Sequence, residues 1–158
     1  MNLNGRGFCA IGVWHVKTET NIGTLVRSAK ILGADFVFTI GRRYKHQSSE
    51  CKHGRHIPVL HFKTVDEWRA TMPANARLIA VEMNENSHCL ENFVHPERAI
   101  YLLGAEDHGL SEEMMRGCQI VQLPGERSMN VSVAGSIVLY DRVVKENLRK
   151  MQFSGVKA

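Results

Sequence analysis

Short apolar segments alternate with amphipathic segments along this chain. Six of the short segments are apolar almost throughout, without the regular apolar–polar alternation of a strand that has one face in water. Continuous apolar runs of this length are typical of strands buried on both faces of a parallel sheet. The predicted strands are residues 8–14, 35–40, 58–62, 77–82, 99–103 and 119–123.

The segments between the strands carry helix signals. The first helix is expected to begin with a cap at Thr20–Asn21 and to stop at Gly33, since its apolar residues recur at helical spacing. Thr64 opens a short helix with a capping-box pattern, and residues 111–113 open another. This alternation predicts an α/β fold, with a mostly parallel sheet and helices on both faces.

The longest predicted helix covers residues 131–150, and it is apolar around most of its circumference. Such a helix must be covered on more than one side. Two interpretations are open: a subunit interface in addition to the core, or a central core helix. Residues 83–97 are expected to form a polar connection of moderate length.

Length and composition indicate an ordinary globular chain. The 158 residues predict one domain over residues 1–158, and 44% hydrophobic residues exclude dominant disorder. No apolar run has the length of a membrane span, and the first residues show no secretory signal. The four cysteines are widely spaced and form no CxxC pair, so we expect reduced thiols, a cytoplasmic location and no membrane partner.

Positive charge is concentrated in residues 42–56. This window holds five Lys or Arg residues against one Glu, so its net charge of +4 equals that of the whole chain. A basic loop that includes an aromatic residue, here Tyr44, is suited to RNA phosphates and a stacked base; the alternative is a solvated basic loop. The predicted RNA-binding residues are Arg42, Arg43, Lys45, Lys52 and Arg55.

Several well-known motifs are absent. The sequence has no GxGxxG, GxxxxGK[ST], HExxH or GxSxG, which argues against dinucleotide, P-loop, zincin and nucleophile-elbow chemistry. Cys51, His53 and His56 have the spacing of zinc ligands but lack an evident fourth ligand and lie in a basic loop. We therefore expect no metal.

Three other segments combine glycine with polar residues at points where a ligand could bind. Residues 21–27 place Gly23 and Arg27 one helical turn apart, outside the apolar face. Residues 104–110 follow a buried strand, and ligands bind at the carboxyl ends of strands in open α/β sheets. Residues 123–133 pass from a strand to the start of the long helix, where polar groups can cap the helix or hold a ligand.

Together these segments resemble the three motifs of the SpoU/TrmH-type branch of the SPOUT (alpha/beta-knot) RNA methyltransferases, in a minimal form without an added RNA-binding domain. They read NxGxxxR, GxExxGL and SMNVS, in the family's order, and the resemblance covers residues 8–148. It implies a C-terminal trefoil knot, a homodimer and S-adenosylmethionine as the methyl donor. The implied reaction is methylation of a ribose 2′-hydroxyl in RNA, with tRNA favoured and rRNA as the alternative.

The resemblance also assigns roles to individual residues. It places Arg27 at the ribose hydroxyl as the catalytic residue, with Asn21, Glu106 and Asn130 organising the site. The donor would be held by Val81, Gly104, Leu123, Ser128 and Met129. Two departures from the family pattern are Ala105, where Asn or Pro is usual, and a short loop over residues 124–128.

The residues leave several alternatives open. A guanidinium is a poor base, so either an RNA phosphate accepts the hydroxyl proton while Arg27 holds the groups together, or the adjacent sulfonium and burial lower the pKa of Arg27. Other classes of function are a non-catalytic RNA-binding member of the fold, a methyltransferase acting on a base, and a small-molecule α/β enzyme. The basic window and the absence of nucleotide-binding loops argue against the last of these.

Overall fold

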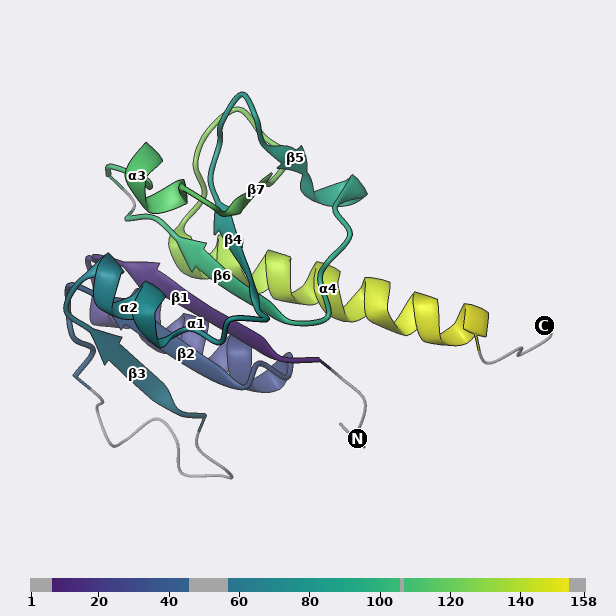
Figure 1. Cartoon of the computed structure of the whole chain (residues 1–158), viewed down its shortest axis with the longest axis horizontal. Helices are drawn as coiled ribbons and strands as arrows, with labels where there is room; N and C mark the ends of the chain where they lie inside the picture. Colours follow the sequence, from purple (N-terminus) through teal and green to yellow (C-terminus); the bar gives the residue numbers. More distant parts are fainter. Residues whose placement is uncertain (1–6, 46–56, 106, 154–158) are drawn as a thin grey trace.

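The computed structural model describes residues 7–45, 57–105 and 107–153, and these form a twisted parallel sheet between two layers of helices (Figure 1). Seven strands pair in the order β3-β2-β1-β6-β4-β7-β5, and every pairing is parallel. The strands are β1 (Cys9–Trp14), β2 (Phe36–Ile40), β3 (Val59–Phe62), β4 (Arg77–Val81), β5 (His88–Cys89), β6 (Ala99–Leu103) and β7 (Gln119–Gln122).

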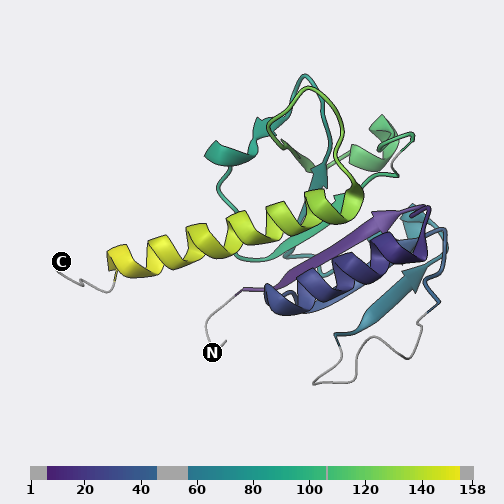
Figure 2. The ribbon, with the colours of Figure 1, turned by 180° about the vertical axis from the view of Figure 1, so that it is seen from behind.

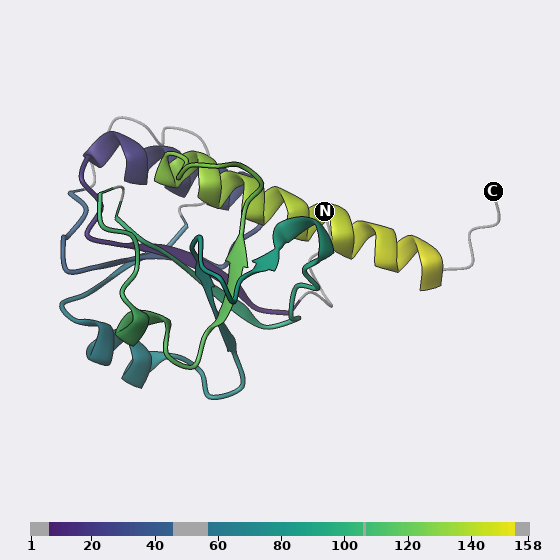
Figure 3. The same cartoon turned by 90° about the horizontal axis from the view of Figure 1, so that it is seen from above.

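Helices cover both faces of this sheet, as predicted. Two long helices lie side by side on one face, and two short ones lie on the other (Figures 2 and 3). The long helices are α1 (Glu19–Ile31) and α4 (Val131–Phe153); the short ones are α2 (Val65–Thr71) and α3 (Glu112–Met115). A 3₁₀ helix, η1 (Leu90–Asn92), follows β5. In the part of the chain that the structure describes, no helix is long and apolar enough to cross a membrane.

The burial of the strands explains their continuous apolar sequences. All five residues of β6 are buried, and five of the six residues of β1 are buried. Side chains on one face form a core with α1 and α4, while those on the other pack against Trp68 of α2 and Met115 of α3. Burial on both faces is therefore the reason that the strands show no apolar–polar alternation.

One local prediction was wrong. Helix α1 is capped by Thr18, whose hydroxyl accepts a hydrogen bond from the Asn21 backbone amide at 3.3 Å, and not by Thr20–Asn21. Thr18 lies one residue before the helix in extended conformation, so it outcompetes the polar residues that follow it. The polar connection over residues 83–97 also contains two short elements that were not predicted, β5 and η1. The trefoil knot stays a prediction.

A close contact between α1 and α4 brings their first turns together. Gly135 lies against Leu25, and a Cβ atom at position 135 would be only 2.6 Å from the Leu25 Cδ1 atom. Directly after Gly135, the Ser136 hydroxyl donates a hydrogen bond to the hydroxyl of Ser28, one turn after Leu25 in α1, at 2.8 Å. The missing side chain therefore allows the two helices to pack closely at the end nearer the carboxyl ends of the strands.

Farther along α4, a buried polar network ties this helix to β6 and to the segment before it. His95 is 2% exposed, and its two ring nitrogens lie 2.6 Å from the Tyr101 hydroxyl and 2.8 Å from Asp141. Arg142 donates to the carbonyls of Pro96 and Glu97 at 2.6 and 2.9 Å. Burial lowers the pKa of His95 and raises the pKa of Tyr101, so both side chains are neutral at pH 7.

Candidate active site

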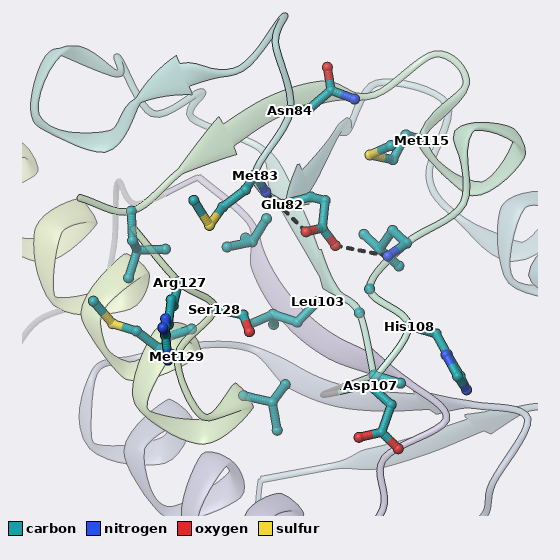
Figure 4. A pocket seen from close by; sticks show the side chains of 18 of the residues that line it. Glu82, Met83, Asn84, Leu103, Asp107, His108, Met115, Arg127, Ser128 and Met129 are labelled. Atoms are coloured by element: carbon teal, nitrogen blue, oxygen red, sulfur yellow. Dashed lines mark hydrogen bonds between the residues drawn. The ribbon is translucent and has the colours of Figure 1, made fainter. Parts of the chain in front are cut away.

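The carboxyl ends of β4, β6 and β7 surround a cavity of about 460 Å³ (Figure 4). These three strands are neighbours in the sheet, with β4 in the centre, so the loops that follow them meet at one edge. This is the position at which open parallel sheets bind ligands. The volume lies within the range of roughly 300–1,000 Å³ that is usual for small-molecule sites.

All five residues predicted to hold the methyl donor line this cavity. Val81 ends β4, Gly104 follows β6, and Leu123 follows β7. The other two, Ser128 and Met129, come from the loop that leads into α4. Three segments separated by up to 48 positions in the sequence thus converge on one space. Their contact with a donor stays a prediction.

The loop after β6 makes a tight turn at the mouth of the cavity. The Gly109 amide donates to the Ala105 carbonyl at 2.9 Å, and Gly109 has a φ of +58°. A Cβ atom on Gly104 would lie 2.4 Å from the Gly109 carbonyl carbon, so any larger residue would force this turn open. The two glycines of the GxExxGL motif are therefore required by the geometry of the turn.

Glu82, the first residue after β4, holds this loop in place. One carboxylate oxygen accepts the Leu110 amide at 2.8 Å, and the other accepts the amide of Met83 at 3.0 Å (Figure 4). The carboxylate also lines the cavity. No motif in the sequence singles out Glu82, which is the last residue of the predicted strand 77–82. Its place at the carboxyl end of a buried strand is the signal that the sequence offers, and its contact with the Leu110 amide is visible only in the fold.

Other ionisable residues line the cavity and were also missed. Asp107 forms an ion pair with Lys17, which joins the loop after β6 to the loop after β1. The remaining ones are His108, Glu112 and Arg127, and all three are exposed. The short loop over residues 124–128 therefore contributes a cation, Arg127, as well as the predicted Ser128.

Two of the residues predicted to organise the site, Asn21 and Asn130, are joined by a hydrogen bond. The Asn130 amide group donates to the Asn21 side-chain oxygen at 3.1 Å. The side-chain oxygen of Asn130 caps α4, because it accepts the Ser132 amide at 3.0 Å and the Ser132 hydroxyl at 2.6 Å. One side chain thus both caps α4 and connects it to α1. Glu106 lies outside the described residues.

Arg27 is exposed on the face of α1 that points away from the sheet. It does not line the cavity, and no hydrogen bond or ion pair links it to any other residue within 7–45, 57–105 or 107–153. Its guanidinium is therefore available to a ligand. Within a single chain the structure does not bring Arg27 together with the five residues predicted to hold the donor.

Three of the predicted RNA-binding residues follow β2 at the same edge of the sheet, and all three are exposed. Arg42 donates to the Val16 and Lys17 carbonyls, and the Lys45 backbone amide donates to Glu19 at 3.1 Å. Arg43 lines a second cavity beside β3, together with Tyr44 and His61. Lys52 and Arg55 lie outside the described residues, as do Cys51, His53 and His56.

The structure offers no metal centre in the residues that it describes, since no three His, Cys, Asp or Glu side chains are grouped to hold an ion. The site is therefore built from an apolar and polar cavity, a carboxylate fixed by backbone amides, and a set of exposed cations.

Comparison with known proteins gives a consistent picture. The model of the SpoU rRNA Methylase family matches residues 9–140. The chain is 25% identical over 140 residues to the tRNA (guanosine(18)-2'-O)-methyltransferase TARBP1 of Mus musculus. That match covers 80% of this chain, and the chain spans 9% of the length of the mouse protein.

Solved structures share the fold. One, described as structural insights into the 2-OH methylation of C/U34 on tRNA, has a TM-score of 0.76 at 20% identity and covers 90% of this chain and 99% of its own. The AdoMet-bound rRNA methyltransferase of Sinorhizobium meliloti has a TM-score of 0.75 at 21% identity, covering 89% of this chain and 57% of its own. The AviRb methyltransferase of Streptomyces viridochromogenes, in complex with AdoMet, has a TM-score of 0.70 at 22% identity. This match covers 90% of this chain and 62% of the AviRb chain.

Proposed function

Because the chain belongs to the SpoU rRNA Methylase family, we propose that it transfers a methyl group from S-adenosylmethionine to a ribose 2′-hydroxyl of RNA. The observation that carries this proposal is the convergence of Val81, Gly104, Leu123, Ser128 and Met129 on one cavity at the carboxyl edge of the sheet. The resemblance to the family assigned these five residues to the donor, and they come from separate segments of the chain.

The cavity suits such a donor. Its volume of about 460 Å³ and its mixed lining match a molecule that has an adenine ring, a ribose and an amino-acid tail. Val81 and Leu123 provide apolar surface, while the Ser128 hydroxyl and the backbone around Gly104 provide hydrogen-bonding groups. When bound, S-adenosylmethionine supplies an electrophilic methyl group on a sulfonium.

The remaining residues act on the RNA. Arg27 binds the ribose hydroxyl or its phosphate with its exposed guanidinium. We assign acceptance of the hydroxyl proton to an RNA phosphate held by Arg27, since a guanidinium has N–H donors and no acceptor atom. Asn130 fixes the start of α4 and, through Asn21, the first turns of α1, which carries Arg27.

We propose tRNA as the substrate. Exposed cations follow β1, β2 and β3 along the edge that also holds the cavity, so a compact stem-loop can contact both. They are Lys17, Arg42, Arg43, Lys45 and Lys63. The names of the mouse relative and of one structural neighbour, both of which refer to tRNA, support this choice. The cytoplasmic location stays a prediction.

We further propose that the active form is a homodimer. Helix α4 packs one side on the sheet, with Val138 and Leu139 buried, and exposes an apolar stripe on its other side. The stripe consists of Val133, Tyr140, Leu148 and Met151, which are 48 to 63% exposed. A second copy would cover the stripe, and it would complete the site if its cavity approached Arg27, which does not line the cavity of its own chain.

The test of the reaction is transfer of labelled methyl groups from S-adenosylmethionine to total tRNA and, separately, to ribosomal RNA. We expect labelled tRNA whose modified linkage resists alkaline cleavage, because only ribose methylation blocks attack by the 2′-hydroxyl. Label in rRNA alone would mean that the substrate is rRNA and not tRNA. Label on an alkali-sensitive linkage would indicate a base methyltransferase, and no label with either RNA would favour a non-catalytic RNA-binding protein.

The test of the dimer is sedimentation of the wild-type chain and of the double variant Tyr140→Glu/Leu148→Glu. The two glutamates would place negative charges in the proposed interface, so we expect the dimer to dissociate and methyl transfer to be lost. Leu60→Glu is the matched control, because Leu60 is also an exposed apolar residue but lies on the edge strand β3. A wild-type monomer with full activity would refute the dimer.

A further inference from the structure

One carboxylate of the described cavity lining, that of Glu82, is partly shielded from water. Among the ionisable residues of the described chain that line the cavity, Glu82 is half-buried, whereas Asp107, His108, Glu112 and Arg127 are exposed. Exposed charges are screened by water and salt, and a half-buried charge is screened much less. Of these described charges, the carboxylate of Glu82 is therefore the one that acts most strongly on a molecule in the cavity.

This carboxylate is held in place without being neutralised. Each of its oxygens accepts one backbone amide, from Leu110 at 2.8 Å and from Met83 at 3.0 Å. No cation within residues 7–45, 57–105 or 107–153 forms an ion pair with Glu82, in contrast to Asp107, which is paired with Lys17. A carboxylate has about four acceptor positions, so positions remain for a ligand.

The turn that faces the carboxylate is shaped around it. A Cβ atom on Gly109 would lie 2.5 Å from a Glu82 carboxylate oxygen, so a larger residue at this position would displace the carboxylate. With one backbone amide on each oxygen, the negative charge is preorganised to act on a bound molecule.

The substrate and product of the proposed reaction differ in charge. S-adenosylmethionine carries a positive sulfonium, and S-adenosylhomocysteine, which remains after transfer, carries a neutral thioether in its place. We propose that Glu82 is the donor-selecting residue of the cavity: its unpaired carboxylate binds the cationic donor in preference to the neutral product, and so favours exchange of product for fresh donor. This inference rests on the proposed methyl transfer.

The experiment is calorimetric titration of the full chain with S-adenosylmethionine, S-adenosylhomocysteine and sinefungin, an unreactive analogue that carries an amine in place of the methylated sulfonium. We expect the wild type to bind both cations more tightly than the neutral product. In Glu82→Gln the preference should shrink by about tenfold, as expected for loss of a charge-assisted contact. Glu82→Asp keeps the charge and should retain most of the preference.

Glu85→Gln is the matched control. Glu85 is an exposed residue three positions further along the same connection, it does not line the cavity, and its substitution should leave the preference unchanged. The ratio of affinities is the decisive readout, because loosening of the Leu110 loop would weaken all three ligands alike. If Glu82→Gln lost the same factor of affinity for all three ligands, Glu82 would have only a structural role, and the inference would be overturned.

The two proposals fail in different ways. Equal binding of the cationic and neutral molecules by the wild type would overturn the inference about Glu82 and leave methyl transfer standing. Failure of the wild type to bind any of the three molecules would overturn the methyl-transfer proposal, and the inference about Glu82 with it.

Discussion

Two polar clusters in this molecule have opposite properties. The cluster around His95, between β6 and α4, is buried, and its polar groups are satisfied by partners inside the protein. The cluster at the carboxyl edge of the sheet surrounds a cavity and leaves most of its polar side chains exposed, Arg127 among them; Arg27 lies outside the cavity and is exposed on α1. Buried polar groups that lose a partner are costly, whereas exposed groups that lose one are not. The first cluster therefore serves stability, whereas the exposed side chains are open to the ligands proposed above.

The most severe test of this contrast is Arg142→Ala. Arg142 is 4% exposed, it pairs with Glu146 at 2.8 Å, and it donates to the carbonyls of Pro96 and Glu97. Its removal breaks a largely buried ion pair with Glu146 and takes the donor from both carbonyls, so we expect a loss of about 3–5 kcal/mol in the free energy of unfolding. Urea denaturation measures the loss. The matched control is Arg98→Ala, an exposed residue of the adjacent segment, and a similar loss there would contradict the assignment.

The second test is Arg27→Ala, with the opposite pattern. Arg27 is exposed and has no partner among the described residues, so we expect an unchanged melting temperature and intact donor binding. Methyl transfer should fall at least about 100-fold, the usual consequence of losing a charged group that acts on the transition state. Arg77→Ala is the control, since Arg77 is exposed at the other edge of the sheet, at the start of β4. Full activity of Arg27→Ala would refute its proposed role.

Asn130 combines the two properties, because it supports both the fold and the candidate site. Asn130→Ala removes the cap of α4, so we expect the free energy of unfolding to fall by about 1 kcal/mol. We also expect the rate of methyl transfer to fall. Asn130→Ser keeps a capping oxygen but cannot reach Asn21 with an amide. We expect Asn130→Ser to restore the melting temperature without restoring the rate. Recovery of both in the same assays would mean that the contact with Asn21 is dispensable.

The smallest effect is the pH dependence of stability. Burial lowers the pKa of His95 below its usual value of 6.5, although Asp141 opposes the shift. The unfolded chain then binds the proton more readily, so the contribution of a neutral His95 to stability is complete above about pH 6.5 and is lost as the pH falls below it. We expect a lower free energy of unfolding at pH 5.5 than at pH 7. In His95→Gln this slope should flatten, and an unchanged slope would assign it to other groups.

The two clusters also differ in how far sequence could predict them. Motifs in a single sequence predicted five cavity residues, because each lies directly after a strand or before a helix, where sequence patterns are clear. The cluster around His95 gave no such signal. Asp141 and Arg142 occur within an apolar helix pattern. Nothing in that pattern shows that Asp141 meets His95 and Arg142 meets Pro96, each 46 positions away.

Edge elements were harder to predict than central ones. The buried strands β1 and β6 follow from their apolar sequences, and the predicted range of β6 is the observed one. By contrast, β5 has two exposed residues, His88 and Cys89, and exists only because β7 lies beside it. Glu82 was missed for a similar reason, since its role depends on the Leu110 amide, 28 positions later.

The hydrogen bond between Asn21 and Asn130 has a consequence for the order of events during protein synthesis. It joins residues 109 positions apart, in the same helix pair in which Gly135 packs against Leu25. A growing chain that has formed β1, α1 and β2 still lacks the cap of α4, the lining of the cavity and the Asn130 side chain that bonds to Asn21. The methyl transfer proposed above therefore requires that the segment beyond residue 130 has emerged from the ribosome.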